Sequence, residues 1–442
     1  MKNSRIRKTI EPKIIPRPSH NVSRDEISKN ALKVLYRLHR SGFQAFLVGG
    51  GVRDAILELH PKDFDIATDA HPEEVRALFG NCRLIGRRFR LAHVRFGKEV
   101  IEVATFRAAA NARDKESDAA QDHHGRILRD NVYGSIDADV WRRDFTCNAL
   151  YYNIADFSIW DYVGGVRDIE RRRLVMIGDP EMRLREDPVR MLRAARFAAK
   201  LNFAIDDSVV QVMHDLGGLL QNVPAARLFD EFLKMFQAGH AEKTFELLWT
   251  HHLFGHLFPE TDSELERDRE FANFVRAALI NTDRRVAAGK SVTPMFLLGV
   301  FLWAPIRRLA AQRRSQEKMS EAQSLAVAAY EVTAMQQSRI AIPRRFTAPM
   351  REMLALQPRL EVHKGRRALN LLEHRRFRAA YDFIMLRAEN GDIGSDIAQF
   401  WTEVQEQDAD QRLQSFEIGR QSQPKKKSRG PRRRKSARAS QP

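Results

Sequence analysis

The chain has 442 residues, of which 43% are hydrophobic and 30% charged, so it is long enough for about two to four globular units. It carries 74 Lys and Arg against 57 Asp and Glu, and the net charge of +17 favours a polyanionic partner. No apolar stretch approaches the roughly 20 residues that span a bilayer, and the N-terminus MKNSRIRKTIEPKII lacks a signal-peptide core, so no membrane segment is expected. Cys82 and Cys147 are too few for a disulfide framework or a zinc site, and a reducing cytoplasm is expected.

The first predicted elements follow a basic, proline-punctuated arm at residues 1–22. Ser23-x-x-Glu26 predicts a capping box that opens a helix. The apolar stripe of that helix is Ile27, Ala31, Val34, Leu35 and Leu38. Strands are then predicted at 44–48, 62–67, 91–96 and 99–106, and helices at 52–59 and 72–79. These elements predict a small mixed α/β head over residues 23–160.

The most informative segment is FLVGGGVRDAILELHPKDFDIAT at 46–68. Gly49, Gly50 and Gly51 lie between a predicted strand and a predicted helix. Glycines there let the backbone approach a ligand closely, and the N–H groups of a helix start favour an anionic triphosphate. By itself, a glycine cluster at such a position usually marks only a tight turn.

A pair of aspartates completes this segment. Because side chains alternate along a strand, Asp63 and Asp65 are expected on one face, with Phe64 in the core. Their Cα atoms would lie about 6.5 Å apart, close enough for both carboxylates to hold one Mg²⁺ and share a second. Mg²⁺ prefers oxygen ligands completed by substrate phosphates. The alternative is a solvated acidic face, and the glycine turn directly upstream favours the metal site.

The rest of the chain is predicted to be mainly helical. Residues 108–127 have no apolar face and predict a mobile loop at the edge of the head. From about 135 the pattern is helical to about 415, apart from strand-like segments at 157–163 and 173–177. We predict a helical neck at 161–225 and a helical, RNA-binding body at 226–418. Residues 419–442 predict a disordered basic tail, since 421–442 contain nine Lys and Arg and no acid.

Four motifs in a specific order carry a resemblance to a known family. They are GGGVRD at 49–54, DFD at 63–65, RRDFTCNALYYN at 142–153 and EDPVRMLRAARFAAKLNF at 186–203. The chain resembles the class II nucleotidyltransferases of the polymerase β superfamily, which comprise bacterial poly(A) polymerases and CCA-adding enzymes. The resemblance covers about residues 25–415, and the segments at 81–107 and 377–389 are more similar to the poly(A) polymerases. It implies an α+β fold with a polymerase-β-like head, an all-α neck and body, and the disordered basic tail.

The resemblance also implies a set of site residues. Asp63 and Asp65 would hold two Mg²⁺ ions, and Gly49, Gly50, Arg53 and Arg142 would contact the nucleotide. In the neck motif, Asp187 and Arg190 would select ATP by its base edge, with support from Arg193. Helical periodicity places Asp187, Arg190 and Arg193 within about one turn of each other, which is also the spacing of an ion-pair lattice.

The third carboxylate has two candidates. Asp144 lies in the RRDF motif that the resemblance marks as functional, and it is the first choice as a catalytic residue. The alternative for Asp144 is a structural ion pair with Arg142 or Arg143. Glu102 lies on the strand that is predicted to neighbour Asp63, and it is kept as a possible direct ligand or as the base that accepts the 3′-hydroxyl proton.

Three functions are therefore in view. The leading one is template-independent transfer of AMP from ATP to RNA 3′ ends with release of pyrophosphate. The resemblance implies that this reaction takes place in the cytoplasm, that the added tails promote RNA decay, and that the RNA-decay machinery is a partner. The second is CCA addition to tRNA. The basic tail and the segment at 81–107 argue against it. A non-catalytic RNA-binding protein ranks last, because both aspartates are present.

Overall fold

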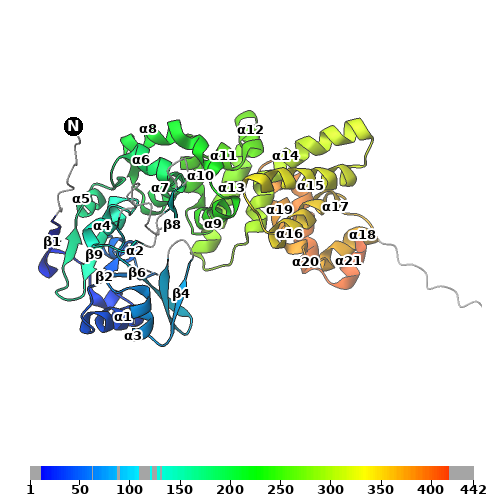
Figure 1. Ribbon diagram of the computed structural model, residues 1–442. Coiled ribbons are helices and arrows are strands. Elements are labelled where there is room, and N and C mark those ends of the chain that lie inside the picture. The colour runs from blue at the N-terminus through cyan, green and yellow to red at the C-terminus, as the bar shows by residue number, and fades with distance from the viewer. Residues whose placement is uncertain are drawn as a thin grey trace, which may run out of the picture. The chain divides into compact units, whose positions relative to one another are not determined.

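A computed structural model describes residues 11–417 except 62, 87–89, 109–119, 122–126 and 130–131 (Figure 1). The chain forms two compact units, Met1–Met350 and Arg351–Pro442, of which the first contains every candidate site residue. The predicted mixed head and helical body are both present. The predicted tail at 419–442 lies outside the described residues, as does most of the predicted loop at 108–127. The described parts of that loop pair as strands β7 (Ala120–Gln121) and β8 (Ile127–Arg129).

The first helix, α1 (Lys29–Arg40), begins later than predicted. Its N-cap is Ser28, whose hydroxyl accepts a hydrogen bond from the Ala31 N–H at 3.0 Å. The predicted capping box at Ser23 is wrong, because Ser23 caps only a short 3-10 turn over Arg24–Glu26. Four residues of the predicted apolar stripe lie buried on α1, and Ile27 is buried but lies before the helix.

The head is built on an eight-stranded sheet with the order β1-β10-β9-β2-β3-β6-β5-β4. The strands are β1 (Lys13–Ile15), β2 (Ala45–Val48), β3 (Asp65–Thr68), β4 (Cys82–Ile85), β5 (Leu91–Phe96), β6 (Glu99–Thr105), β9 (Leu150–Asn153) and β10 (Ile159–Asp161). Strand β1 pairs with β10, so part of the predicted arm at 1–22 is an edge strand. Strands β4 and β9 were not predicted, and β9 reads as a continuous buried run without the alternation that marks a half-buried strand.

The two faces of this sheet are covered differently. Helices α1 and α3 (Pro72–Leu78) pack on one face, as the lower left of Figure 1 shows. On the other face, α4 (Ile136–Val140) joins a buried cluster that includes Phe46, Val48 and Tyr151. The ends of β3 and β6 on this second face carry the acidic candidate residues.

The helical part of the first unit follows the head. Its elements are α2 (Gly50–Ile56) within the head, then α5 (Gly165–Glu170), α6 (Pro180–Glu186), α7 (Val189–Leu201), α8 (Asp207–Leu216), α9 (Ala225–Phe236), α10 (Ala241–Thr250), α11 (Phe254–Leu257), α12 (Pro259–Arg267), α13 (Arg269–Ala287), α14 (Pro294–Glu317), α15 (Glu321–Arg339) and α16 (Arg344–Ala355), which reaches into the second unit. A short parallel pair, β11 (Arg173–Leu174) and β12 (Ala204–Ile205), links α5 to the end of α7.

Helix α14 is long and apolar enough to cross a membrane by length and composition alone, which the sequence analysis did not anticipate. Of its most apolar window, 61% is buried inside the protein. Phe301 on this helix lies in an aromatic cluster with Phe232, Phe236, Phe245, Phe254 and Phe258. Helix α14 therefore packs as a core helix of the first unit.

The second unit contains α17 (Gln357–Glu361), α18 (Arg366–Leu369), α19 (Phe377–Glu389), α20 (Ser395–Glu406) and α21 (Ala409–Ser415). Trp401 is fully buried at its centre and donates its indole N–H to the Leu360 carbonyl at 2.7 Å. The buried Arg387 guanidinium is paired with Asp392 at 2.7 Å and Glu361 at 2.8 Å. An apolar core and a satisfied buried cation thus hold these helices together.

Candidate active site

The glycine turn forms the floor of the candidate site. Strand β2 runs into Gly49, the N-cap of α2, whose φ of 68° is a conformation that side chains rarely adopt. A Cβ on Gly49 would lie 3.6 Å from Nη1 of Arg143, and one on Gly51 would lie 3.4 Å from the Asp63 carbonyl. The three-glycine turn therefore packs directly against both the aspartate segment and the RRDF motif.

The two aspartates are placed as the alternation predicted, although the strand begins later. Strand β3 starts at Asp65, so Asp63 lies just before it. Phe64 is buried at 8% exposure, whereas Asp63 and Asp65 are exposed. Both acids thus face away from the core that holds Phe64.

Glu102 lies beside Asp65. Strands β3 and β6 are parallel and pair Asp65 with Glu102 in register, so both side chains are on the same face of the sheet. The Asp65 side chain is solvent-exposed, but other groups surround its carboxylate. Partial burial, Glu102 and Asp63 raise its pKa to about 6, and Arg143 opposes this shift. Asp63, Asp65 and Glu102 therefore form an acidic corner, in which the lowering effect of Arg143 is smaller than the combined raising effects.

These carboxylates fit a divalent cation. Among the described residues, no three His, Cys, Asp or Glu side chains are grouped closely enough to hold a metal by themselves. Mg²⁺, however, usually takes one or two protein carboxylates and completes its shell with water and substrate phosphates. A cation next to Asp65 would also relieve the repulsion that raises the pKa of this carboxyl group.

Arg53 supports the glycine turn from beneath. Its buried guanidinium donates to Oδ1 of Asp54 at 2.8 and 2.6 Å and to Oδ1 of Asn148. Lys200 on α7 binds the second oxygen of Asp54 at 2.8 Å. Its described bonds make Arg53 a support of the turn, and a direct contact with the nucleotide stays a prediction.

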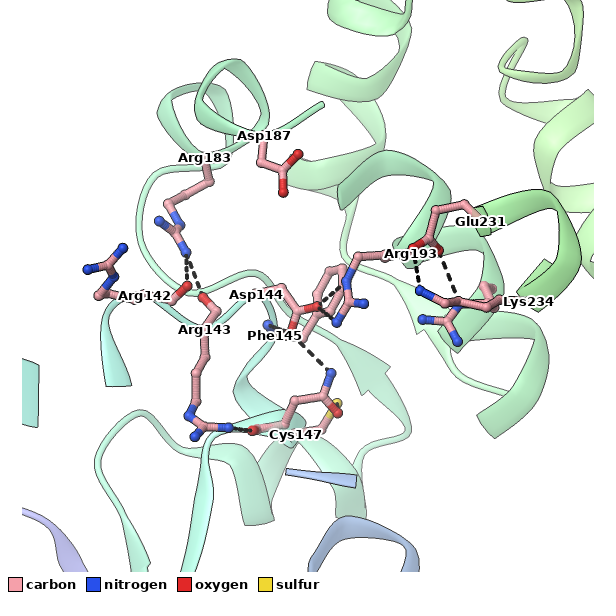
Figure 2. A network of polar contacts seen from close by, with 12 residues as sticks. Arg142, Arg143, Asp144, Phe145, Cys147, Arg183, Asp187, Arg193, Glu231 and Lys234 are labelled. Carbon is pink, nitrogen blue, oxygen red and sulfur yellow. Dashed lines mark hydrogen bonds and ion pairs between the residues drawn. The ribbon is translucent and has the colours of Figure 1, made fainter. Parts of the chain in front are cut away.

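Asp144 is buried, and both of its carboxylate oxygens take part in a polar network (Figure 2). Arg193 donates to Oδ2 at 2.7 and 2.5 Å, while the Asn148 amide and the Phe145 N–H donate to Oδ1 at 3.1 and 2.9 Å. Burial disfavours the charged carboxylate, but Arg193 and these hydrogen bonds hold its pKa at about 2. The ion pair that the sequence analysis kept as the alternative for Asp144 is therefore present, with Arg193 as the partner in place of Arg142 or Arg143.

The neck motif is not one continuous helix, so the prediction that its three residues share a helix surface is wrong. Helix α6 ends at Glu186, Asp187 adopts extended backbone angles, and α7 begins after Pro188. Proline breaks the helix here because it restricts the residue before it to extended conformations. Asp187 is consequently turned toward α9, where Arg227 grips both its oxygens at 2.7 Å.

Arginines gather on the other side of that junction. Arg190 donates to Glu186 at 2.7 Å and to the Arg183 carbonyl at 2.7 Å, while Arg183 donates to the carbonyls of Arg142 and Arg143 at 3.0 and 2.7 Å. Burial lowers the pKa of Arg142 to about 10, with further lowering by Arg107, Arg183 and Arg190. Burial and Arg190 likewise lower the pKa of Arg183 to about 10. Glu186 opposes the lowering in both cases, joined for Arg183 by Asp144 and Asp187, and an anion bound here would oppose it further.

The fold matches solved nucleotidyltransferase structures. A structure described as "tRNA-processing enzyme (apo form I)" superposes with a TM-score of 0.54 at 21% identity, over 89% of this chain and 98% of its own. A "tRNA nucleotidyltransferase complexed with a primer tRNA and an incoming ATP analog" superposes with a TM-score of 0.52 at 21% identity, over 84% and 98%. The fold is thus that of the tRNA-processing nucleotidyltransferases.

Sequence comparison narrows this class. The Poly A polymerase head domain matches residues 45–175, the "Probable RNA and SrmB- binding site of polymerase A" matches 202–265, and the Polymerase A arginine-rich C-terminus matches 317–436. Poly(A) polymerase I of Escherichia coli O6:H1 is 45% identical over 95% of this chain and 92% of its own, and that of Haemophilus influenzae is 42% identical over 98% of each. The chain belongs to the poly(A) polymerase family. A CCA-adding enzyme of Lactobacillus helveticus is 36% identical over 49% of this chain and 52% of its own.

Sequence reasoning missed three residues of this site. Arg143 lies under Gly49, lowers the pKa of Asp65 and binds the Tyr151 hydroxyl at 2.8 Å. Asn148 links Arg53 to Asp144. Arg143 and Asn148 both lie in the RRDFTCN motif at 142–148, so the motif itself pointed to them as candidate site residues. Arg227 lies 40 residues from Asp187, and no motif marks it.

Proposed function

We propose that this enzyme adds AMP residues from ATP to RNA 3′ ends without a template and releases pyrophosphate. The observation that carries the proposal is the acidic corner of Asp63, Asp65 and Glu102 on the glycine turn. Family membership supports the transfer of adenylate, and the match to the RNA-binding and arginine-rich families supports RNA as the acceptor.

The acidic corner would organise the chemistry. The 3′-hydroxyl oxygen attacks the α-phosphorus of ATP, the bond to the β-phosphate oxygen breaks, and the hydroxyl proton passes to a nearby base. Asp63 and Asp65 would hold Mg²⁺, with two ions as the expected number, and the metal when bound supplies charge neutralisation and lowers the pKa of the hydroxyl. Glu102, which pairs in register with Asp65, would accept that proton or complete the metal shell. Asp144 has its oxygens bound by Arg193, Asn148 and Phe145, which favours Glu102 as the third carboxylate.

The neck would bind and select the nucleotide. The cationic group of Arg142, Arg183 and Arg190 has the charge to hold a triphosphate, which would relieve its mutual repulsion. Asp187 and Arg190 would read the adenine edge. Because Arg227 fixes both oxygens of Asp187, that carboxylate has one orientation, as a selective hydrogen-bond acceptor requires.

The experiment that tests this proposal supplies two RNAs with Mg²⁺. One is a generic unstructured oligonucleotide and the other a tRNA without its CCA end, each with ATP alone, CTP alone, or both. Long ladders on the generic RNA with ATP alone are expected. Extension of the tRNA only, stopping after three nucleotides and requiring CTP, would establish the alternative function of a CCA-adding enzyme. Absence of any extension would leave the RNA-binding reading.

The same proposal extends to RNA turnover. A single-stranded A tail gives a 3′ exonuclease a foothold on an otherwise structured end. A structured RNA extended by this enzyme should be degraded faster by a purified 3′ exonuclease than the same RNA without a tail. Equal decay of the two RNAs would separate tail addition from RNA decay.

A further inference from the structure

One histidine lies against the acidic corner on the side away from Asp65. Strands β5 and β6 are antiparallel and pair His93 with Glu102 in register. Strand β4 pairs Arg83 with His93 in turn, so one face of the sheet carries the row Asp65, Glu102, His93 and Arg83 across four strands. Neighbouring strands are about 4.8 Å apart, which brings each side chain of this row next to the following one. Glu102 therefore stands between Asp65 and the imidazole.

The contact between the two side chains is direct. Nε2 of His93 lies 3.4 Å from Oε1 of Glu102, and the side chains are 20% and 48% exposed respectively. A half-exposed glutamate at the surface of a strand has many rotamers, and fixing one of them costs conformational entropy. A contact from a better-buried neighbour restricts those rotamers and leaves the second oxygen, Oε2, available to the acidic corner.

We propose that His93 is a positioning residue that holds Glu102 in its working orientation. Nε2 of His93 lies 3.4 Å from Oε1, so in this role Glu102 would keep Oε2 for a metal ion or for the 3′-hydroxyl proton. Carboxylates that bind metals are typically held by such outer hydrogen bonds, and removal of the outer partner costs about 10- to 100-fold in activity or metal affinity. An imidazole suits this position because it holds one oxygen without the full charge of a lysine or arginine. The proposal rests on the proposed function, in which Glu102 is the third carboxylate.

The first test compares His93→Leu, His93→Gln and the control His39→Leu. His39 is exposed on α1, which packs on the opposite face of the sheet. For His93→Leu we expect kcat for AMP addition to fall about 10- to 100-fold with the KM for ATP unchanged, because the nucleotide contacts lie in the neck. His93→Gln should restore most of kcat, since its amide N–H can reach Oε1, and His39→Leu should match the parent enzyme. If His93→Leu does not fold, His93→Asn replaces it, because the shorter amide cannot reach Glu102.

The second test asks whether His93 acts through Glu102. The double variant His93→Leu/Glu102→Gln should lose no more activity than Glu102→Gln alone, because the residue that His93 positions is already disabled. Independent losses that multiply in the double variant would overturn the proposal. So would a His93→Leu enzyme with the kcat of the parent, or a His93→Gln enzyme as slow as His93→Leu.

The third test needs no activity. Mn²⁺ binding to the full chain without RNA, measured by calorimetry, should weaken about tenfold in His93→Leu, and the double variant should bind Mn²⁺ no more weakly than Glu102→Gln alone. If the parent enzyme binds Mn²⁺ but extends no RNA, the proposed function fails while the positioning role can still be read from metal binding. If the parent extends RNA and His93→Leu equals it in kcat and Mn²⁺ affinity, only the positioning role fails.

Discussion

Two parts of the candidate site each concentrate charge of one sign, negative in the first and positive in the second. In the acidic corner, burial raises the pKa of Asp65 to about 6 with help from Glu102 and Asp63, and Arg143 opposes this shift. Where the head meets the neck, burial lowers the pKa of Arg142 to about 10, with further lowering by Arg107, Arg183 and Arg190, and Glu186 opposes this shift. Each arrangement costs the folded protein stability unless a ligand of the opposite charge is bound. Divalent cations suit the first part and a triphosphate the second.

The charges next to these two parts are matched inside the protein. Asp144 is paired with Arg193, Asp187 with Arg227, and Asp54 with Lys200. Several arginines outside the head are also paired: Arg308 binds Glu260 and Glu264, Arg313 binds Glu317 and Glu331, and Arg375 and Arg376 bind Glu352. The difference separates charges that a bound ligand would offset from charges that are already paired within the protein.

The largest effect is expected when the Asp65 carboxylate is removed from the acidic corner. Asp65→Ala should reduce AMP transfer at least about a thousandfold, since metal-assisted charge stabilisation is worth several kcal/mol and each 1.36 kcal/mol is a factor of ten. Single-turnover extension of a generic RNA measures this. Asp207→Ala, at a side chain that is 100% exposed, is the control and should leave the rate unchanged. An Asp65→Ala enzyme with more than a tenth of parental activity would break the comparison at its acidic side.

A matched acid should behave in the opposite way. Asp144→Ala should lower the free energy of unfolding by about 3–5 kcal/mol, because it leaves the partly buried Arg193 guanidinium without its partner. Since folding depresses the pKa of Asp144 to about 2, below its ordinary 3.8, its contribution is complete above 3.8 and is lost as the pH falls through about 2. Denaturant unfolding at pH 7 and pH 3 measures this. Unchanged stability with abolished activity would instead make Asp144 a catalytic residue.

Nucleotide selection tests a matched pair at the border of the neck. Arg227→Met should raise the KM for ATP about 10- to 100-fold and admit other nucleotides, because a charge-assisted hydrogen bond is worth about 1.5–3 kcal/mol. Arg227→Lys should lie between, since lysine cannot grip both oxygens of Asp187 in a planar fork. Incorporation of each of the four nucleotides on one RNA measures this. Unchanged selectivity in Arg227→Met would show that the orientation of Asp187 does not govern the choice of base.

The basic tail extends the comparison to RNA. Truncation after residue 420 removes the nine Lys and Arg of 421–442 and should flatten the slope of log affinity against log salt by up to about 6. RNA binding at several salt concentrations measures the slope, and a tail with the same composition in scrambled order is the matched control. Metal binding in the head should not change. An unchanged slope after truncation would remove the tail from RNA binding.

The smallest effect concerns the pH dependence of the metal-free protein. Because folding raises the pKa of Asp65 from 3.8 to about 6, its ionisation costs stability as the pH rises through about 6, and that cost is absent below 3.8. Asp65→Asn should therefore gain stability relative to the parent above pH 6, by no more than about 1 kcal/mol because solvent screens an exposed carboxylate. Thermal unfolding at pH 4 and pH 7 measures this. Mg²⁺ should stabilise the parent at pH 7 and leave Asp65→Asn almost unchanged.

Much of the site could be predicted because its signals are local. The glycine turn and the Asp63-Phe64-Asp65 alternation depend on neighbouring residues only, and the structure places Phe64 in the core and both acids outside it. Local signals failed where a neighbour in space or a backbone break decided the outcome. Ser28 displaced Ser23 as the cap of α1, and Pro188 split the neck motif that periodicity had treated as one helix.

The sequence by itself determined the class of the protein, the mixed head followed by helices, and the segment that carries the acids, because motif order and hydrophobic periodicity are properties of the chain. Only the tertiary structure decided which charges are matched. Sheet register set Glu102 between Asp65 and His93, and packing of α7 and α9 brought Arg193 to Asp144 and Arg227 to Asp187. These partners lie up to 49 residues apart, and the energy of an ion pair depends on distance and burial in space, which sequence spacing does not specify.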